Sequence, residues 1–241
     1  MKEQHVPIDA AGGSRKGVGR RCNEDRFLVE TMADSMLLAV SDGMGGHPAG
    51  DIAAADILRS LTNWPKERFH PLPFLIDAVA RAESTILGRV AQNTDLTGMG
   101  ATVTAAIIQA RKIFWVHVGD TRLYLLRDGQ LQQITRDHSF LQDFIDDGTY
   151  TPQQAAEHPM AHMLDQCVGC ADTVPDSGSF SLAAGDILLL CSDGVYRPLG
   201  EAEMGALLSP AREAVDQIDN LLEAAVRAGS RDDVTAVVAV T

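Results

Sequence analysis

Five acidic motifs stand out along the chain because each lies beside the end of a predicted strand. They are Asn23-Glu24-Asp25, Ser41-Asp42-Gly43, Gly119-Asp120, Ser192-Asp193-Gly194 and Asp232-Asp233. One Asp-Gly pair after a strand is usually a turn. Five acidic sites are harder to explain as turns, since carboxylates that come together repel one another unless cations lie between them. Oxygen ligands without histidine or cysteine at ligand spacing favour Mg²⁺, Mn²⁺ or Ca²⁺ over Zn²⁺. The motifs therefore predict a divalent-metal site.

The elements that must position these motifs follow from hydrophobic periodicity. Apolar or alternating runs predict strands at residues 5–10, 27–30, 36–40, 101–110, 113–118, 122–126, 131–134, 187–191 and 233–240. Apolar stripes predict helices at residues 48–61, 73–92, 201–208 and 211–228, with one helical turn near 151–157. Helices group in two places and strands run together between them. This pattern favours an α+β fold with antiparallel sheets over a doubly wound parallel sheet.

Composition limits the classes of protein that fit. The 241 residues, 45% hydrophobic and without an evident linker, predict one domain over 1–241. The 33 acidic and 20 basic residues give a formal net charge of −13, which argues against binding to nucleic acid or to anionic membranes. The surplus carboxylates are either a solvated surface or a group that converges on cations. With no run of about 18 apolar residues and no signal-peptide pattern, we expect a cytoplasmic protein without membrane insertion.

The four cysteines are too few for a disulfide scaffold. Cys167 and Cys170 have the CxxC spacing, but neither a thioredoxin-like βαβ pattern nor a second pair for zinc accompanies them. We expect two ordinary thiols there, and buried packing roles for Cys22 and Cys191.

Seven motifs in a fixed order carry a family resemblance. They are Arg20-x-x-x-Glu24-Asp25, Asp42-Gly43-Met44-Gly45-Gly46-His47, Gly100-Ala101-Thr102, Gly119-Asp120-Thr121-Arg122, Thr135-Arg136-Asp137-His138-Ser139, Cys191-Ser192-Asp193-Gly194 and Asp232-Asp233-Val234-Thr235. Each motif alone is weak, but together they span nearly the whole chain. The chain resembles the metal-dependent Ser/Thr protein phosphatases of the PP2C (PPM) family in their short bacterial form. The resemblance implies a four-layer α-β-β-α sandwich with two central antiparallel sheets.

The resemblance also implies roles for individual residues. Asp42 bridges two Mn²⁺ or Mg²⁺ ions, and the Gly43 carbonyl binds one of them. Asp193 and Asp232 hold the first ion, Glu24 approaches the second, and Asp25 orients metal-bound water. The bridging water attacks phosphorus, since two divalent ions lower its pKa.

Two further roles concern cations around the phosphate. The planar guanidinium of Arg20 fits two phosphate oxygens; the alternative is a solvated arginine in the basic run 15–21. Asp120 is where some bacterial members place a third, weaker ion shared with Asp193, although an ordinary turn between strands also explains this aspartate.

Three departures from the family pattern affect the mechanism and the substrate. Met44 stands where many relatives have a histidine proposed as general acid, which leaves His47 or metal-bound water to protonate the leaving group. Asp233 replaces a frequent asparagine, either as an added ligand or as solvent-facing charge. Residues 140–174 match the family's flap, and Ala161-His162 stands where many bacterial relatives carry Arg-Asn, so substrate preference is expected to differ.

The resemblance thus predicts a monomeric phosphoserine and phosphothreonine phosphatase. Its partners are phosphorylated proteins and a eukaryotic-like Ser/Thr kinase, with type VI secretion control as one candidate pathway. Two alternatives stay open: a phosphatase of a sigma-factor regulator, and a catalytically weak family member that binds partners.

Overall fold

The computed structural model describes residues 8–32, 35–44, 49–62 and 69–241. Within them, ten strands form two five-stranded antiparallel sheets. The first sheet has the order β1-β10-β9-β6-β7, with bounds β1 Asp9–Arg15, β10 Val234–Val240, β9 Ile187–Cys191, β6 Arg122–Arg127 and β7 Gln130–Gln133. The second has the order β2-β3-β4-β5-β8, with bounds β2 Arg26–Met32, β3 Ser35–Ser41, β4 Val103–Gln109, β5 Lys112–Val118 and β8 Asp176–Ser181.

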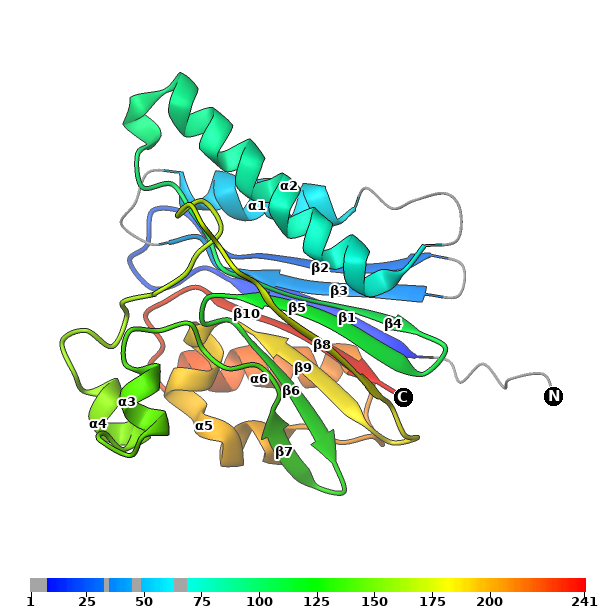
Figure 1. The fold of residues 1–241 in the computed structure, drawn as a ribbon. Coiled ribbons are helices and arrows are strands. Elements are labelled where there is room, and N and C mark those ends of the chain that lie inside the picture. Colours follow the sequence, from blue (N-terminus) through cyan, green and yellow to red (C-terminus); the bar gives the residue numbers. More distant parts are fainter. Residues whose placement is uncertain (1–7, 33–34, 45–48, 63–68) are drawn as a thin grey trace.

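Helices cover the outer faces of the stacked sheets (Figure 1). Helices α1 (Gly50–Leu61) and α2 (Pro71–Gln92) lie on the second sheet, and α5 (Asp193–Leu207) and α6 (Ala214–Arg227) lie on the first. The short helices α3 (Gln142–Asp146) and α4 (Pro152–Ala156) lie to one side, and a single 3₁₀ turn occupies Thr94–Leu96. The α+β prediction and the four-layer sandwich are confirmed. None of the helices in the described residues has the length and apolarity that a membrane span requires.

Three apolar layers hold the sandwich together. The middle layer joins the inner faces of the two sheets, with Leu38 and Ile108 on one side and Leu190 and Val237 on the other. The outer layers lie between each sheet and its pair of helices. Every residue of β3, β9 and β10 is buried, because each strand is covered on both faces. This explains why their sequences are continuous apolar runs and not alternating ones.

The first predicted strand was misplaced. We expected a strand over residues 5–10, but residues 5–7 lie outside the described part, and β1 continues through Gly12 and Gly13 to Arg15. At Gly13 a Cβ atom would lie 2.7 Å from Ile218 Cγ2. Gly13 therefore serves the close approach of α6 to the sheet, and Gly12 makes room for the ring of Phe27, so neither marks a turn.

Several elements were missed or shortened. Strand β8 was not predicted because its sequence, DSGSFS, is polar and half exposed, and pairing with the edge of β5 decides its conformation. Helix α5 begins at Asp193, eight residues before its predicted start, because Ser-Asp-Gly here leads into a helix and not a turn. Gly200, with φ 69°, kinks it between the two halves. Helix α3 and the 3₁₀ turn at Thr94–Leu96 were also not predicted. The remaining helices and strands agree with the predictions to within a few residues, and residue 48 lies outside the described part.

The cysteine predictions need correction. Cys167 and Cys170 are joined by a disulfide, with their Cα atoms 5.4 Å apart, so the expectation of two free thiols is wrong. The backbone turns at Gly169, with φ 107°, which brings the two cysteines together. Cys191 is buried as expected, but Cys22 is exposed. One domain over the whole of 1–241 stays a prediction.

Candidate active site

Antiparallel register brings the acidic motifs to one end of the sandwich, where strands of both sheets begin or end. In the second sheet, Arg26 at the start of β2 pairs with Ser41 at the end of β3, which places Asp25 beside Asp42. In the first sheet, Arg122 at the start of β6 pairs with Cys191 at the end of β9, which places the Asp120 turn beside Asp193. Arg15 pairs with Val234, so the loop that carries Arg20 and Glu24 lies beside Asp232.

Backbone contacts fix the loop of Asp42 and Gly43. The Asp42 N–H donates to Thr102 Oγ1 at 3.0 Å, and the Thr102 N–H donates to the Asp42 carbonyl at 2.8 Å. The Gly43 N–H donates to the Glu24 carbonyl at 3.3 Å. A Cβ atom at Gly43 would lie 2.4 Å from the Gly50 backbone, so only glycine lets the loop approach the start of α1 this closely.

Asp25 and Asp193 are buried with one oxygen each left unpartnered. The Ser192 hydroxyl donates to Asp25 Oδ2 at 2.7 Å and accepts from the Thr235 N–H at 3.1 Å. The Oδ1 atoms of Asp25 and Asp193 have no hydrogen-bond partner within the described part of the chain. Buried polar atoms are nearly always satisfied, so an unpartnered carboxylate oxygen indicates a place for a bound ion or water.

The carboxylates also raise one another's pKa. Burial raises the pKa of Asp193 to about 8, with Asp120, Asp232 and Asp25 adding to the shift. Burial raises the pKa of Asp25 to about 6. The pKa of Asp42 lies well above its usual value because of burial and then the charges of its neighbours. Burial also raises the pKa of Glu24. The raised pKa values indicate that the protein's own positive charges do not fully offset the negative charge of these four carboxylates.

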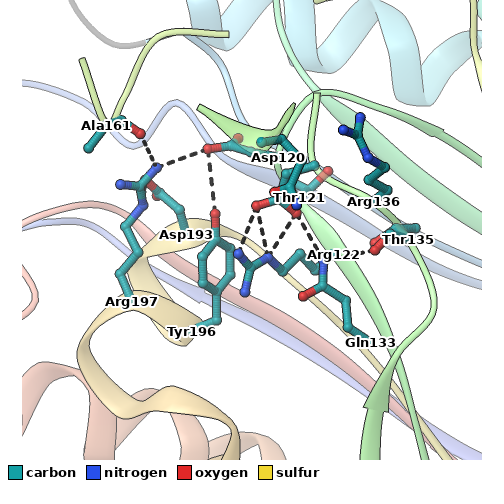
Figure 2. Close-up of polar contacts among 12 residues, drawn as sticks. Asp120, Thr121, Arg122, Gln133, Thr135, Arg136, Ala161, Asp193, Tyr196 and Arg197 are labelled. Atoms are coloured by element: carbon teal, nitrogen blue, oxygen red, sulfur yellow. Dashed lines mark hydrogen bonds and ion pairs between the residues drawn. The ribbon is translucent and has the colours of Figure 1, made fainter. Parts of the chain in front are cut away.

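Two arginines contact the carboxylates. Arg20 Nη1 lies 3.3 Å from Glu24 Oε2, and its Nη2 pairs with Asp232 Oδ1. Arg197 Nε lies 2.9 Å from Asp193 Oδ2, and its Nη2 lies 3.1 Å from Asp120 Oδ2 (Figure 2). Arg197 did not emerge from the sequence. It lies four residues after Asp193, on the same helical face, but this signal is readable only once α5 is known to begin at Asp193.

The donor set fits divalent cations. In the described residues, no three His, Cys, Asp or Glu side chains are placed to hold a metal ion as they stand. Arg20 and Arg197 contact four of the carboxylates. The unpartnered oxygens and the raised pKa values nevertheless show a site that lacks positive charge, and oxygen donors suit Mn²⁺ and Mg²⁺. The fold gathers every predicted site residue, and the ligand roles stay predictions.

Asp233 has a different role from either one expected. It is 2% exposed, and its two carboxylate oxygens accept the N–H groups of Gly17 and Glu24, each at 2.8 Å. Its oxygens are thus occupied and it does not face solvent. Asp233 ties the loop of Arg20 to the start of β10, which sets the position of the guanidinium.

The flap segment, residues 140–174, reaches the site through Ala161. The Ala161 carbonyl accepts from Arg197 Nη2 at 3.4 Å. Arg136 pairs with Asp143 and Asp146 on α3, and Val168 forms an isolated bridge with Ala101, next to Thr102. A role of residues 140–174 in substrate choice stays a prediction. Met44 is described, but His47 lies outside the described residues.

Comparison with known proteins identifies the family. Residues 12–235 match the family model for protein phosphatase 2C. The chain is 39% identical over 232 residues to the serine/threonine protein phosphatase PstP of Mycobacterium tuberculosis, a match that covers 95% of this chain and 44% of PstP. It is 32% identical to the serine/threonine phosphatase Stp of Listeria innocua, covering 91% of this chain and 90% of Stp.

A solved structure gives the same fold. The catalytic domain of PstP in complex with two manganese ions superimposes with a TM-score of 0.85 at 36% identity, covering 96% of this chain and 97% of that one. The chain therefore belongs to the protein phosphatase 2C family. It spans less than half the length of the full PstP protein.

The raised pKa values predict how the metal-free protein responds to pH. The Asp193 pKa of about 8 and the Asp25 pKa of about 6 exceed the usual 3.8, so the unfolded chain releases these protons at lower pH than the folded protein. Stability without metal should therefore fall as pH rises from about 4 to about 8. At pH 8, Asp193→Asn should raise the melting temperature by more than about 2 °C, the smallest shift that 1 kcal/mol gives in a domain this size. The exposed Asp219→Asn is the control. Equal melting temperatures for wild type and Asp193→Asn would contradict the electrostatic account.

The Asp233 contacts predict a local effect. Asp233→Asn keeps one acceptor and turns an amide donor toward the second N–H, so the loop should lose about 1–3 kcal/mol of local stability. Hydrogen exchange at the Gly17 and Glu24 amides should speed up about tenfold or more. Asp186→Asn is a matched control, because Asp186 is equally buried and binds Arg127 elsewhere. Unchanged exchange at both amides would show that Asp233 does not hold the loop.

Proposed function

We propose that this chain hydrolyses phosphoserine and phosphothreonine in proteins as a metal-dependent phosphatase. The observation that supports this most is the group of buried carboxylates with unpartnered oxygens, placed next to the guanidinium of Arg20. Such a group needs divalent cations, and a nearby arginine suits a phosphate dianion. Membership of the protein phosphatase 2C family supports the same activity.

The proposed ligands are the carboxylates of Asp42, Asp193, Asp232 and Glu24 and the carbonyl of Gly43. Two Mn²⁺ or Mg²⁺ ions bound there would activate water near neutral pH and neutralise phosphoryl oxygens. A third ion beside Asp120 is not part of this proposal, because the guanidinium of Arg197 contacts both carboxylates that would hold it.

The protein's own residues bind the phosphate and orient the attacking water. Arg20 pairs here with Glu24 and Asp232, so its guanidinium must exchange these partners for phosphate oxygens when substrate binds. The Ser192 hydroxyl holds Asp25 Oδ2, which leaves Oδ1 to accept a hydrogen from water. Burial raises the pKa of Asp25 in the metal-free protein, and nearby divalent cations would favour its charged form, which is the form that accepts a hydrogen bond from water. The leaving group also needs a proton. Metal-bound water and His47 stay the two predicted donors.

The substrates in this proposal are proteins phosphorylated by a eukaryotic-like Ser/Thr kinase. The two relatives reported above, both called serine/threonine phosphatases, support the substrate class but not the pathway. Type VI secretion control, dephosphorylation of a sigma-factor regulator, cytoplasmic location and a monomeric state stay predictions. A partner-binding protein with weak catalysis is the alternative that the next experiment separates.

Hydrolysis should depend strictly on divalent metal. We expect excess EDTA to abolish turnover of a phosphothreonine peptide and of para-nitrophenyl phosphate, and Mn²⁺ to restore both. Phosphate release with and without the chelator measures this. Full activity in a sample verified as metal-free would exclude the proposed mechanism, and no activity with Mn²⁺ on either substrate would favour the partner-binding alternative.

Arg20 and Asp42 should separate phosphate binding from metal binding. Arg20→Ala should lower kcat/KM by the equivalent of about 2–4 kcal/mol, the scale of one charge-assisted partner in a catalytic site. Its Mn²⁺ affinity should hold or rise, since Arg20 occupies Glu24 and Asp232 in this structure. Asp42→Asn should lose Mn²⁺ binding and nearly all turnover. Isothermal titration of both variants gives the comparison, and equal loss of Mn²⁺ binding in the two would contradict these roles.

A further inference from the structure

The guanidinium of Arg197 lies between two buried carboxylates at the site (Figure 2). Its Nε forms an ion pair with Asp193 Oδ2 at 2.9 Å, and its Nη2 donates to Asp120 Oδ2 at 3.1 Å. The same Nη2 lies 3.4 Å from the Ala161 carbonyl oxygen. Three oxygens from three separate segments thus meet one cation, which is how oxygen ligands surround a metal ion.

The surrounding structure fixes both carboxylates. Asp193 stands at the start of α5, 8% exposed, directly after the buried strand β9. Asp120 is 6% exposed in the turn between β5 and β6, and the Tyr196 hydroxyl lies 3.5 Å from its Oδ2. The ring of Tyr196 packs against the guanidinium of Arg122, 3.6 Å from the ring centroid, which holds the tyrosine in place. Two fixed, buried carboxylates can both carry their charge only if a cation lies between them, because otherwise one of them keeps its proton.

We propose that Arg197 is the built-in cation of Asp120 and Asp193 and that it keeps a third divalent ion out of this place. Because the guanidinium is planar and always charged, it bridges two carboxylates without changing its protonation state. It uses Oδ2 of each aspartate, whereas a divalent ion in the same place would need these oxygens and would repel the positive charge. Asp193 Oδ1 stays unpartnered, available to the pair of ions in the proposed function.

The proposal predicts the number of bound ions in each variant. By equilibrium dialysis against Mn²⁺ with elemental analysis, the wild-type protein should bind two ions. Arg197→Ala should bind three, the third more weakly than the other two by about tenfold or more, because it gains only two protein carboxylates. Arg197→Ala combined with Asp120→Asn should return to two ions, and Arg197→Lys, which keeps the charge, should bind two.

A matched arginine controls for charge removal in general. Arg136 also joins two carboxylates, Asp143 and Asp146, but these are exposed on α3. Arg136→Ala should therefore keep two bound ions, which would show that freeing any acidic pair does not create an ion site.

Several outcomes would overturn the proposal. It is wrong if Arg197→Ala binds only two ions, or if the wild-type protein binds three and Asp120→Asn loses one. If Arg197→Ala does not fold, as judged by circular dichroism, the wild-type protein and Asp120→Asn decide: equal numbers of ions support the proposal. The inference assumes the two-ion site of the proposed function, and the two failures differ, since a wild-type protein that binds no Mn²⁺ refutes that function instead.

Discussion

The strands of both sheets bring buried aspartates to one end of the sandwich, where burial and mutual repulsion oppose the charged form of each. Asp42 follows β3, Asp193 follows β9 and Asp25 precedes β2. Burial of several like charges destabilises a fold unless cations offset it. The raised pKa values of Asp42, Asp193 and Asp25 express this cost in the protein without metal. Much of the local structure serves to hold or neutralise these carboxylates.

Different interactions hold the carboxylates in place. The apolar layer between the sheets fixes the register of β3 and β9, and with it the position of the aspartate that follows each strand. Asp193 also stands in the first turn of α5, where the helix dipole favours negative charge. Asp233 uses both of its oxygens on backbone N–H groups, so it stabilises the loop of Arg20 instead of adding to the uncompensated charge.

The sequence predicted most elements because burial on both faces leaves a strong pattern. The runs at 36–40 and 187–191 match β3 and β9 closely, and the Ser-Asp-Gly after each lies at the site. The pattern alone did not select a four-layer sandwich, and the family resemblance was needed for that. β8 was missed because a polar edge strand has no periodic signal, and its pairing with β5 is a tertiary interaction.

The site residues also fall into those that a local motif reveals and those that only a long-range contact reveals. The carboxylates and Arg20 were predicted from motifs, since short spacings and strand ends are visible in one chain. Arg197 and the role of Asp233 were missed because each depends on contacts between segments far apart in sequence: Arg197 with Asp120, and Asp233 with Gly17. The Cys167–Cys170 disulfide was missed because CxxC spacing does not reveal the turn at Gly169. Long-range contacts of this kind leave no local pattern.

Two divalent ions and the guanidinium of Arg197 together would neutralise the carboxylates at this end of the sandwich. Anomalous diffraction from crystals grown with Mn²⁺ tests this most directly, because each bound ion gives its own peak. We expect two peaks, both beside Asp42, with the guanidinium of Arg197 still between Asp120 and Asp193. A peak between Asp120 and Asp193 with Arg197 displaced, or no peak beside Asp42, would contradict it.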